Sequence, residues 1–113
     1  MRIPFIKMHG NGNDFVIIDN SDDRINPKKS FIKKITSRKF GIGCDQLIFM
    51  ENSKNCDIFM RIFNPDGSEA EMCGNAARCV ASLLISGQKK NEISIETMSS
   101  NLIGKLEKFN QIS

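Results

Sequence analysis

A cysteine stands where a helix is about to begin. Residues 71–84 read EMCGNAARCVASLL, and the alanine- and leucine-rich part predicts a helix over residues 74–87. The first turn of a helix has N–H groups without intrahelical acceptors, and together with the helix dipole these favour negative charge. A thiol at such a position can exist as thiol or thiolate near neutral pH, as general acid–base catalysis requires. Cys73 is therefore a candidate proton-transfer residue; the alternative is a small buried apolar side chain.

The same helix start could bind an anion. Free N–H groups at a helix N-terminus suit a carboxylate, and Gly74 would let that group approach the backbone closely. Cys79 offers an internal comparison, because it lies six residues further along and roughly 240° around the helix. It is in mid-helix without free N–H groups, so we expect it in the core.

The other thiols and the histidine form no recognisable metal site. Cys44 and Cys56 complete a set of four cysteines with Cys73 and Cys79, and no two of them make a C-x-x-C pair. His9 is the single histidine and is expected to be structural. We therefore predict reduced thiols and no metal.

Glycine-rich turns do not complete a nucleotide or calcium motif. Gly10 and Gly12 lie between two predicted strands and lack the third glycine and the helix of a dinucleotide loop. Gly41 and Gly43 follow a helix rather than a strand. The Asn-Pro-Asp-Gly turn at residues 64–67 lacks the acidic ligands of a calcium loop.

Composition limits the class of partner. The chain has 113 residues, enough for one domain, and a net charge of +3. Residues 28–39 are rich in lysine and arginine, Arg38 included, but no aromatic platform accompanies them, so a solvated surface is favoured over a nucleic-acid site. No apolar run approaches the roughly 18 residues of a membrane span. No signal peptide is recognisable, and a cytoplasmic location is the expectation.

Periodicity and turn residues predict pairs of strands alternating with single helices. Asn26 is expected as the N-cap of the first helix, with Pro27 at its first position, and Gly41 should end it near Phe40. The order strand–strand–helix, repeated and followed by two strands, indicates an antiparallel α+β fold. The predicted strands are residues 3–10, 14–20, 46–51, 57–63, 92–97 and 102–109.

Three motifs together resemble the diaminopimelate epimerase family. They are KMHGNGNDF at residues 7–15, GIGCDQ at 41–46 and RIFNPDGSEAEMCGNAARC at 61–79. The resemblance implies an α+β fold in which a mostly antiparallel β-sheet or barrel wraps around a central helix. It also implies that residues 1–113 are the N-terminal domain and that the second domain of the family is absent from this chain.

The resemblance implies an activity as well. It would be the cofactor-independent interconversion of LL- and meso-diaminopimelate, in lysine and peptidoglycan-precursor biosynthesis, with one catalytic cysteine from each domain. Cys73 would be one of the two, and Cys44, Cys56 and Cys79 are wrongly placed to be the other. We therefore expect the chain alone to be inactive in epimerisation. The expected partners are diaminopimelate and the missing C-terminal domain, and a homodimer is left open.

Substrate-binding residues follow from the same resemblance. Asn13, Gln46 and Asn64 match substrate-binding positions of the family, and Gly74 and Asn75 match its anchor for the α-carboxylate. Amide side chains donate and accept hydrogen bonds together, which suits a zwitterionic ligand. Each amide also has a simpler role: Asn64 could begin a turn, Asn13 could adopt a left-handed conformation, and Gln46 could be polar surface.

Two other functions remain as alternatives. A proline racemase-like isomerase of the same superfamily would also carry Met-Cys-Gly before the helix, but such chains usually continue with histidine where this one has Asn75. A non-catalytic small-molecule-binding or thiol-sensor relic is favoured by the missing second half. A truncated chain, or a split or interrupted reading frame, would account for that missing half.

Overall fold

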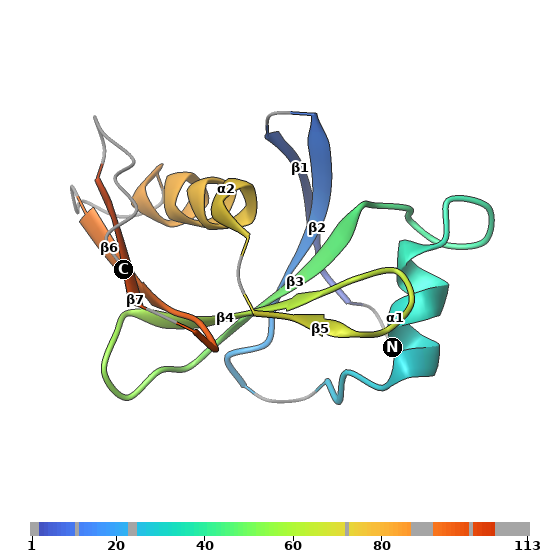
Figure 1. Ribbon diagram of the computed structural model, residues 1–113, viewed down its shortest axis with the longest axis horizontal. Helices are drawn as coiled ribbons and strands as arrows, with labels where there is room; N and C mark the ends of the chain where they lie inside the picture. Colours follow the sequence, from blue (N-terminus) through green and yellow to red (C-terminus); the bar gives the residue numbers. More distant parts are fainter. Residues whose placement is uncertain are drawn as a thin grey trace.

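The computed structural model describes residues 3–10, 12–22, 25–71, 73–86, 92–99 and 101–105. They form one curled sheet and two helices (Figure 1). Neighbouring strands along the sheet are β1, β2, β3, β4, β6 and β7, and the short β5 pairs with β4. The helices are α1, Lys29–Thr36, and α2, Gly74–Ser86. The strands are β1 Ile6–Gly10, β2 Asn13–Asp19, β3 Gln46–Glu51, β4 Ile58–Phe63, β5 Glu69–Ala70, β6 Glu92–Glu96 and β7 Asn101–Lys105.

Most strand pairs are antiparallel, and the predicted α+β class is confirmed. The antiparallel pairs are β1–β2, β3–β4, β4–β5 and β6–β7. The pairs β2–β3 and β4–β6 are parallel, which the element order did not indicate. Helix α1 lies between β2 and β3, and helix α2 lies between β4 and β6. A crossover through a helix lets the second strand of each pair run in the same direction as the first.

Both faces of the sheet are covered, because its central strands are apolar on both sides. In β2, Phe15 and Ile17 belong to the core on the α2 side, whereas Val16 and Ile18 belong to the core on the α1 side. This two-sided burial explains the unbroken apolar run of that strand. Figure 1 shows α2 in the hollow of the sheet, between the β1–β2 pair and the β6–β7 pair. The predicted central helix is therefore confirmed.

Helix α1 begins later than predicted. Its first residue is Lys29, with the extended Lys28 as N-cap (φ −70°, ψ 150°), so the predicted start at residues 26–27 is wrong. The side chain of Asn20 explains the delay. It accepts a hydrogen bond from the N–H of Ile25 and donates one to the carbonyl of the same residue, each at 3.0 Å. These two bonds fix the approach to the helix as a loop.

Helix α1 also ends earlier than predicted. It stops at Thr36 because Ser37 is extended (φ −63°, ψ 123°). Ser37 then folds the chain back, since its Oγ accepts from the N–H of Phe40 at 3.1 Å and its carbonyl accepts from that of Gly41 at 2.9 Å. A Cβ on Gly41 would lie 1.9 Å from the carbonyl oxygen of Lys34. Glycine is required there by this close approach rather than by a helix cap near Phe40.

The remaining boundaries agree with the sequence to within a few residues. Strand β5 was not predicted, because two residues carry no periodicity. Residues 106–109 of the last predicted strand lie outside the described residues. Within the part of the chain that is described, neither helix has the length and apolar character to cross a membrane.

Candidate functional site

Three of the predicted amide residues lie at the same end of neighbouring strands, a region called the sheet edge below. Asn13 is the first residue of β2, Gln46 is the first of β3, and Asn64 directly follows β4. Because β2 runs parallel to β3 and β4 runs antiparallel to it, these ends lie at the same edge. The register agrees, since Gln46 is paired with Phe15.

Hydrogen bonds join the predicted residues in two pairs. Gln46 Nε2 donates to Asn64 Oδ1 at 3.1 Å. Asn75 Nδ2 donates to Asn13 Oδ1 at 3.3 Å. Asn75 is in the first turn of α2, so the second bond ties the start of the helix to the start of β2. The fold thus brings together side chains that lie 62 positions apart in sequence.

Gln46 has an acceptor that the described residues leave without a donor. Its Oε1 is buried and has no hydrogen-bond partner among them. An unsatisfied buried acceptor of this kind costs about 1–3 kcal/mol. The cost would be removed by a ligand that places an N–H group against this oxygen.

Asn64 begins the turn, as its sequence position suggested. Its carbonyl accepts from the N–H of Gly67 at 2.9 Å, which closes the turn through Pro65 and Asp66, and Gly67 has a φ of +91°. Its side chain points elsewhere, because Nδ2 donates to Ser68 Oγ at 3.1 Å while Oδ1 accepts from Gln46. The turn therefore fixes the backbone and leaves the amide at the sheet edge.

Cys73 is at the N-terminus of α2, as predicted. It directly precedes Gly74, and its carbonyl accepts from the N–H of Ala77 at 3.0 Å, the first bond of the helix. The helix N–H groups before that of Ala77 have no acceptor within the helix and point toward its N-terminal end. Cys73 is half-buried and packs against the core on the α2 side. The position of Cys73 is therefore compatible both with a proton-transfer role and with packing against the core.

Cys79 is buried, and its predicted place in the core is confirmed. Its Sγ lies 3.8 Å from the carbonyl oxygen of His9, and burial, with a smaller effect from nearby Cys73, raises the pKa of its thiol. Burial likewise raises the pKa of Cys44. Among the described residues, no group of three His, Cys, Asp or Glu side chains could hold a metal ion.

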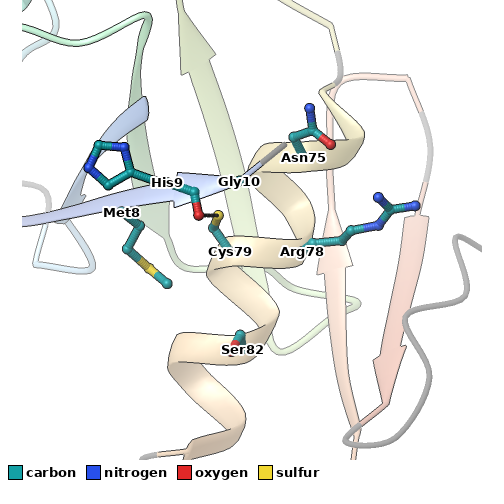
Figure 2. A pocket seen from close by; sticks show the side chains of 7 residues that line it. All are labelled: Met8, His9, Gly10, Asn75, Arg78, Cys79 and Ser82. Carbon is teal, nitrogen blue, oxygen red and sulfur yellow. Dashed lines mark hydrogen bonds between the residues drawn. The ribbon is translucent and has the colours of Figure 1, made fainter. Parts of the chain in front are cut away.

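A pocket of about 280 Å³ lies between β1 and α2 (Figure 2). It contains one predicted site residue, Asn75, beside Cys79 and Arg78. Cys73 and the amides of the sheet edge are not among its lining residues. A Cβ on Gly10 would come within 3.1 Å of Cys79 Sγ, so glycine lets the strand approach the helix here. The pocket is therefore a neighbour of the candidate site and not the site itself.

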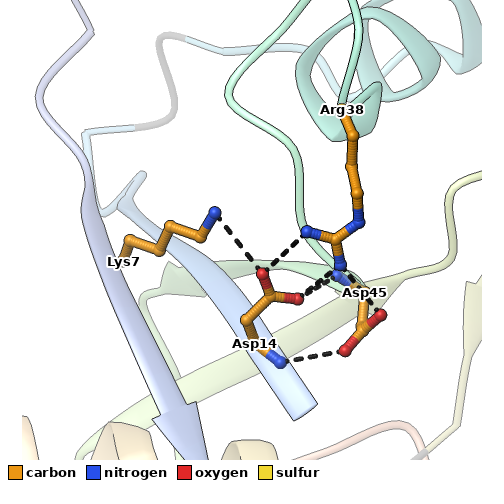
Figure 3. Close-up of polar contacts among 4 residues, drawn as sticks. All are labelled: Lys7, Asp14, Arg38 and Asp45. Atoms are coloured by element: carbon orange, nitrogen blue, oxygen red, sulfur yellow. Dashed lines mark hydrogen bonds and ion pairs between the residues drawn. The ribbon is translucent and has the colours of Figure 1, made fainter.

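A charged cluster beside the sheet edge was missed by the sequence reasoning (Figure 3). Arg38 donates to both carboxylate oxygens of Asp14, at 2.8 and 3.0 Å, and to Asp45 at 3.0 Å. Lys7 Nζ lies 3.4 Å from Asp14. Arg38, and more weakly Asp45 and Lys7, hold the pKa of the Asp14 carboxyl well below its ordinary value despite burial. Arg38 is exposed, as the predicted solvated basic face requires, and its pairing with Asp14 and Asp45 is what the sequence did not indicate.

A sequence signal for the cluster was present. Asp14 directly follows Asn13, and Asp45 directly precedes Gln46, so each acid adjoins a predicted site residue. Nothing in the local sequence of Arg38 indicated its partners, since 24 positions separate it from Asp14.

Solved structures share this fold. A phenazine biosynthesis protein of the PhzF family from Enterococcus faecalis matches with a TM-score of 0.71 and 16% identity, over 93% of this chain and 40% of that one. A methylitaconate-delta-isomerase matches with a TM-score of 0.71 and 16% identity, over 98% of this chain and 36% of that one. At such identities the likeness shows the fold alone. The class is that of α+β proteins in which a curled sheet encloses a central helix.

Sequence comparison narrows this class to one family. The family model for diaminopimelate epimerase matches residues 5–111, so the chain belongs to the diaminopimelate epimerase family. The diaminopimelate epimerase of Rhodospirillum centenum is 47% identical over 95 residues, which are 82% of this chain and 33% of that protein. The one from Wolbachia sp. subsp. Drosophila simulans is 50% identical over 99 residues, 88% of this chain and 36% of that protein. The chain thus spans about a third of the length of these curated relatives.

Proposed function

We propose that this chain supplies one of two proton-transfer cysteines in an enzyme that interconverts LL- and meso-diaminopimelate. The observation that carries the proposal is the arrangement of Cys73 at the N-terminus of α2, with that N-terminus tied to the start of β2 by the Asn75–Asn13 hydrogen bond. Membership of the family supports the choice of substrate and of reaction.

The chemistry is a proton transfer at the α-carbon. The thiolate of Cys73 takes the α-proton, so that an S–H bond forms while the C–H bond breaks. The electron pair is delocalised into the α-carboxylate, whose growing charge is stabilised by N–H groups at the start of α2, next to Gly74 and Asn75. A second thiol on the opposite face then donates a proton to the α-carbon and inverts its configuration. In this proposal the second thiol belongs to a further domain.

The amides at the sheet edge would bind the polar groups of the substrate. Gln46 Oε1 is a buried acceptor with no donor among the described residues, so it suits an ammonium group of diaminopimelate. Asn64 is placed to assist it through their shared hydrogen bond. Asn13 reaches the helix start through Asn75 and would orient the α-carboxylate there.

The rest of the proposal concerns the whole enzyme. It works without a cofactor, is cytoplasmic, and is completed by a C-terminal domain that carries the second cysteine. A homodimer is compatible with this arrangement. A proline racemase-like reaction is disfavoured because Asn75, not histidine, follows the Met-Cys-Gly sequence and engages Asn13.

The chain of 113 residues is expected to give no epimerisation by itself. One cysteine cannot act on both faces of the α-carbon, and the open sheet edge leaves the reacting group in contact with water. The measurement is solvent-deuterium incorporation at the α-carbon of LL-diaminopimelate, followed by NMR, with Cys73→Ala as the matched control. Appreciable incorporation with inversion to the meso form by the unaltered chain, lost in that variant, would show that a single cysteine suffices.

A chimera supplies the positive arm of the same experiment. The chain would be joined to the part of the Rhodospirillum centenum relative that lies beyond the matched segment. We expect α-deuterium incorporation with inversion, lowered by about 10²–10⁴-fold in Cys73→Ala, the range for loss of a general acid–base group. A folded chimera whose activity survives that substitution would contradict the role of Cys73.

A further inference from the structure

The charged cluster adjoins two proposed substrate-binding residues without including them (Figure 3). Asp14 is the second residue of β2, directly after Asn13. Asp45 directly precedes Gln46, the first residue of β3. Arg38 comes from the loop that follows α1 and reaches both acids.

Reciprocal hydrogen bonds already link the two strand starts. The N–H of Asp14 donates to Asp45 Oδ2 at 3.0 Å. The N–H of Asp45 donates to Asp14 Oδ1 at 2.8 Å, and lies 3.0 Å from the Asp14 carbonyl oxygen. Each carboxylate therefore satisfies a backbone group of the other strand. Rotation of either carboxylate would break these hydrogen bonds.

Arg38 limits those rotations. Its Nη1 and Nη2 donate to the two carboxylate oxygens of Asp14, and Nη2 also donates to Asp45. Such a two-pronged contact fixes direction as well as distance, which a single ammonium group cannot do. The arginine side chain is 57% exposed, so solvent screens part of what the pair contributes to stability. The two-pronged contact also fixes the geometry of both carboxylates.

We infer that Arg38 is a positioning residue: it holds Asp14 and Asp45 so that the starts of β2 and β3 present Asn13 and Gln46 at fixed positions. The catalytic value of this positioning rests on the proposed function. The geometric claim does not, because it concerns side chains of the free protein.

The test uses the side-chain amide NMR signals of Asn13 and Gln46 in the substrate-free, 15N-labelled chain. Arg38→Met is expected to shift or broaden both signals in a chain that remains folded. Arg38→Lys keeps the positive charge but loses the two-pronged contact with Asp14. We therefore expect neither amide signal to return to its position in the parent chain. Because no substrate is present, failure of this test and failure of the proposed function are distinguishable.

Arg61→Met is the matched control. Arg61 makes a comparable two-pronged pair with Glu69, at 2.8 and 3.1 Å, between β4 and β5. Its loss should leave the Asn13 signal unchanged. Unchanged Asn13 and Gln46 signals in Arg38→Met would overturn the inference, and so would full restoration by lysine.

A second variant decides the matter if Arg38→Met does not fold. Asp45→Asn keeps the Arg38–Asp14 pair but weakens the link to β3. We expect the Gln46 signal to move more than that of Asn13. Equal and negligible movement of both would overturn the inference.

Discussion

In a Cys56→Ser background, replacing Cys73 by alanine is expected to lower the rate at which iodoacetamide alkylates the chain by about tenfold or more at neutral pH. The reagent attacks thiolate, and Cys73 is a half-buried thiol at a helix N-terminus, where negative charge is favoured. Cys44 and Cys79 are buried, and burial raises the pKa of both. The measurement is a time course of modification at each cysteine, by mass spectrometry of digested protein.

The design needs one background substitution and one control. Cys56 is also half-buried, so Cys56→Ser removes its contribution. Cys79→Ala in the same background should leave labelling of Cys73 largely intact. Alkylation of Cys44 or Cys79 as fast as that of Cys73 would contradict the special reactivity of the helix start.

Gly41→Ala is expected to destabilise the fold by about 3 kcal/mol, the upper end for an overpacked site. The new Cβ would lie 1.9 Å from the carbonyl oxygen of Lys34 and 2.8 Å from that of Ile35. Both atoms belong to the backbone of α1, so neither can move aside without disturbing the helix end. Chemical denaturation of variant and parent chain measures the effect.

Gly12→Ala is the matched control for this prediction. Gly12 has a φ of +86° but nothing within 4 Å of its hypothetical Cβ, so only backbone strain is added. That strain is expected to cost about 1 kcal/mol. If the two variants lose the same free energy of unfolding, the contact with α1 does not explain the need for glycine at position 41.

The parts of the site that depend on local sequence were predictable. Cys73 could be placed at a helix start because small and apolar residues follow it at once, and α2 begins at Gly74. The buried position of Cys79 followed from helical geometry alone. Asn13 and Gln46 were proposed as site residues only through the family motifs, since an isolated amide at the start of a strand carries no local signal of function.

The parts that depend on contacts between distant residues were not predictable. Helix α1 starts at Lys29 because Asn20 holds Ile25, a contact that propensity does not include. Two further contacts likewise exist only once the sheet has formed. They are the parallel pairing of β2 with β3 and the hydrogen bonds from Arg38 to Asp14. Local composition therefore placed Arg38 correctly on a solvated face, but it could not indicate the pairing of Arg38 with Asp14 and Asp45.

The most direct test of the central claim is protection of Cys73 by substrate. Iodoacetamide modification of each cysteine would be followed in the 113-residue chain with and without millimolar diaminopimelate, with proline as the comparison ligand. If Cys73 faces the α-carbon of bound diaminopimelate, that ligand should slow modification of Cys73 and not of Cys56, and proline should have no effect. Equal modification rates of Cys73 with and without diaminopimelate would contradict the account, and protection by proline alone would point to the racemase-like alternative.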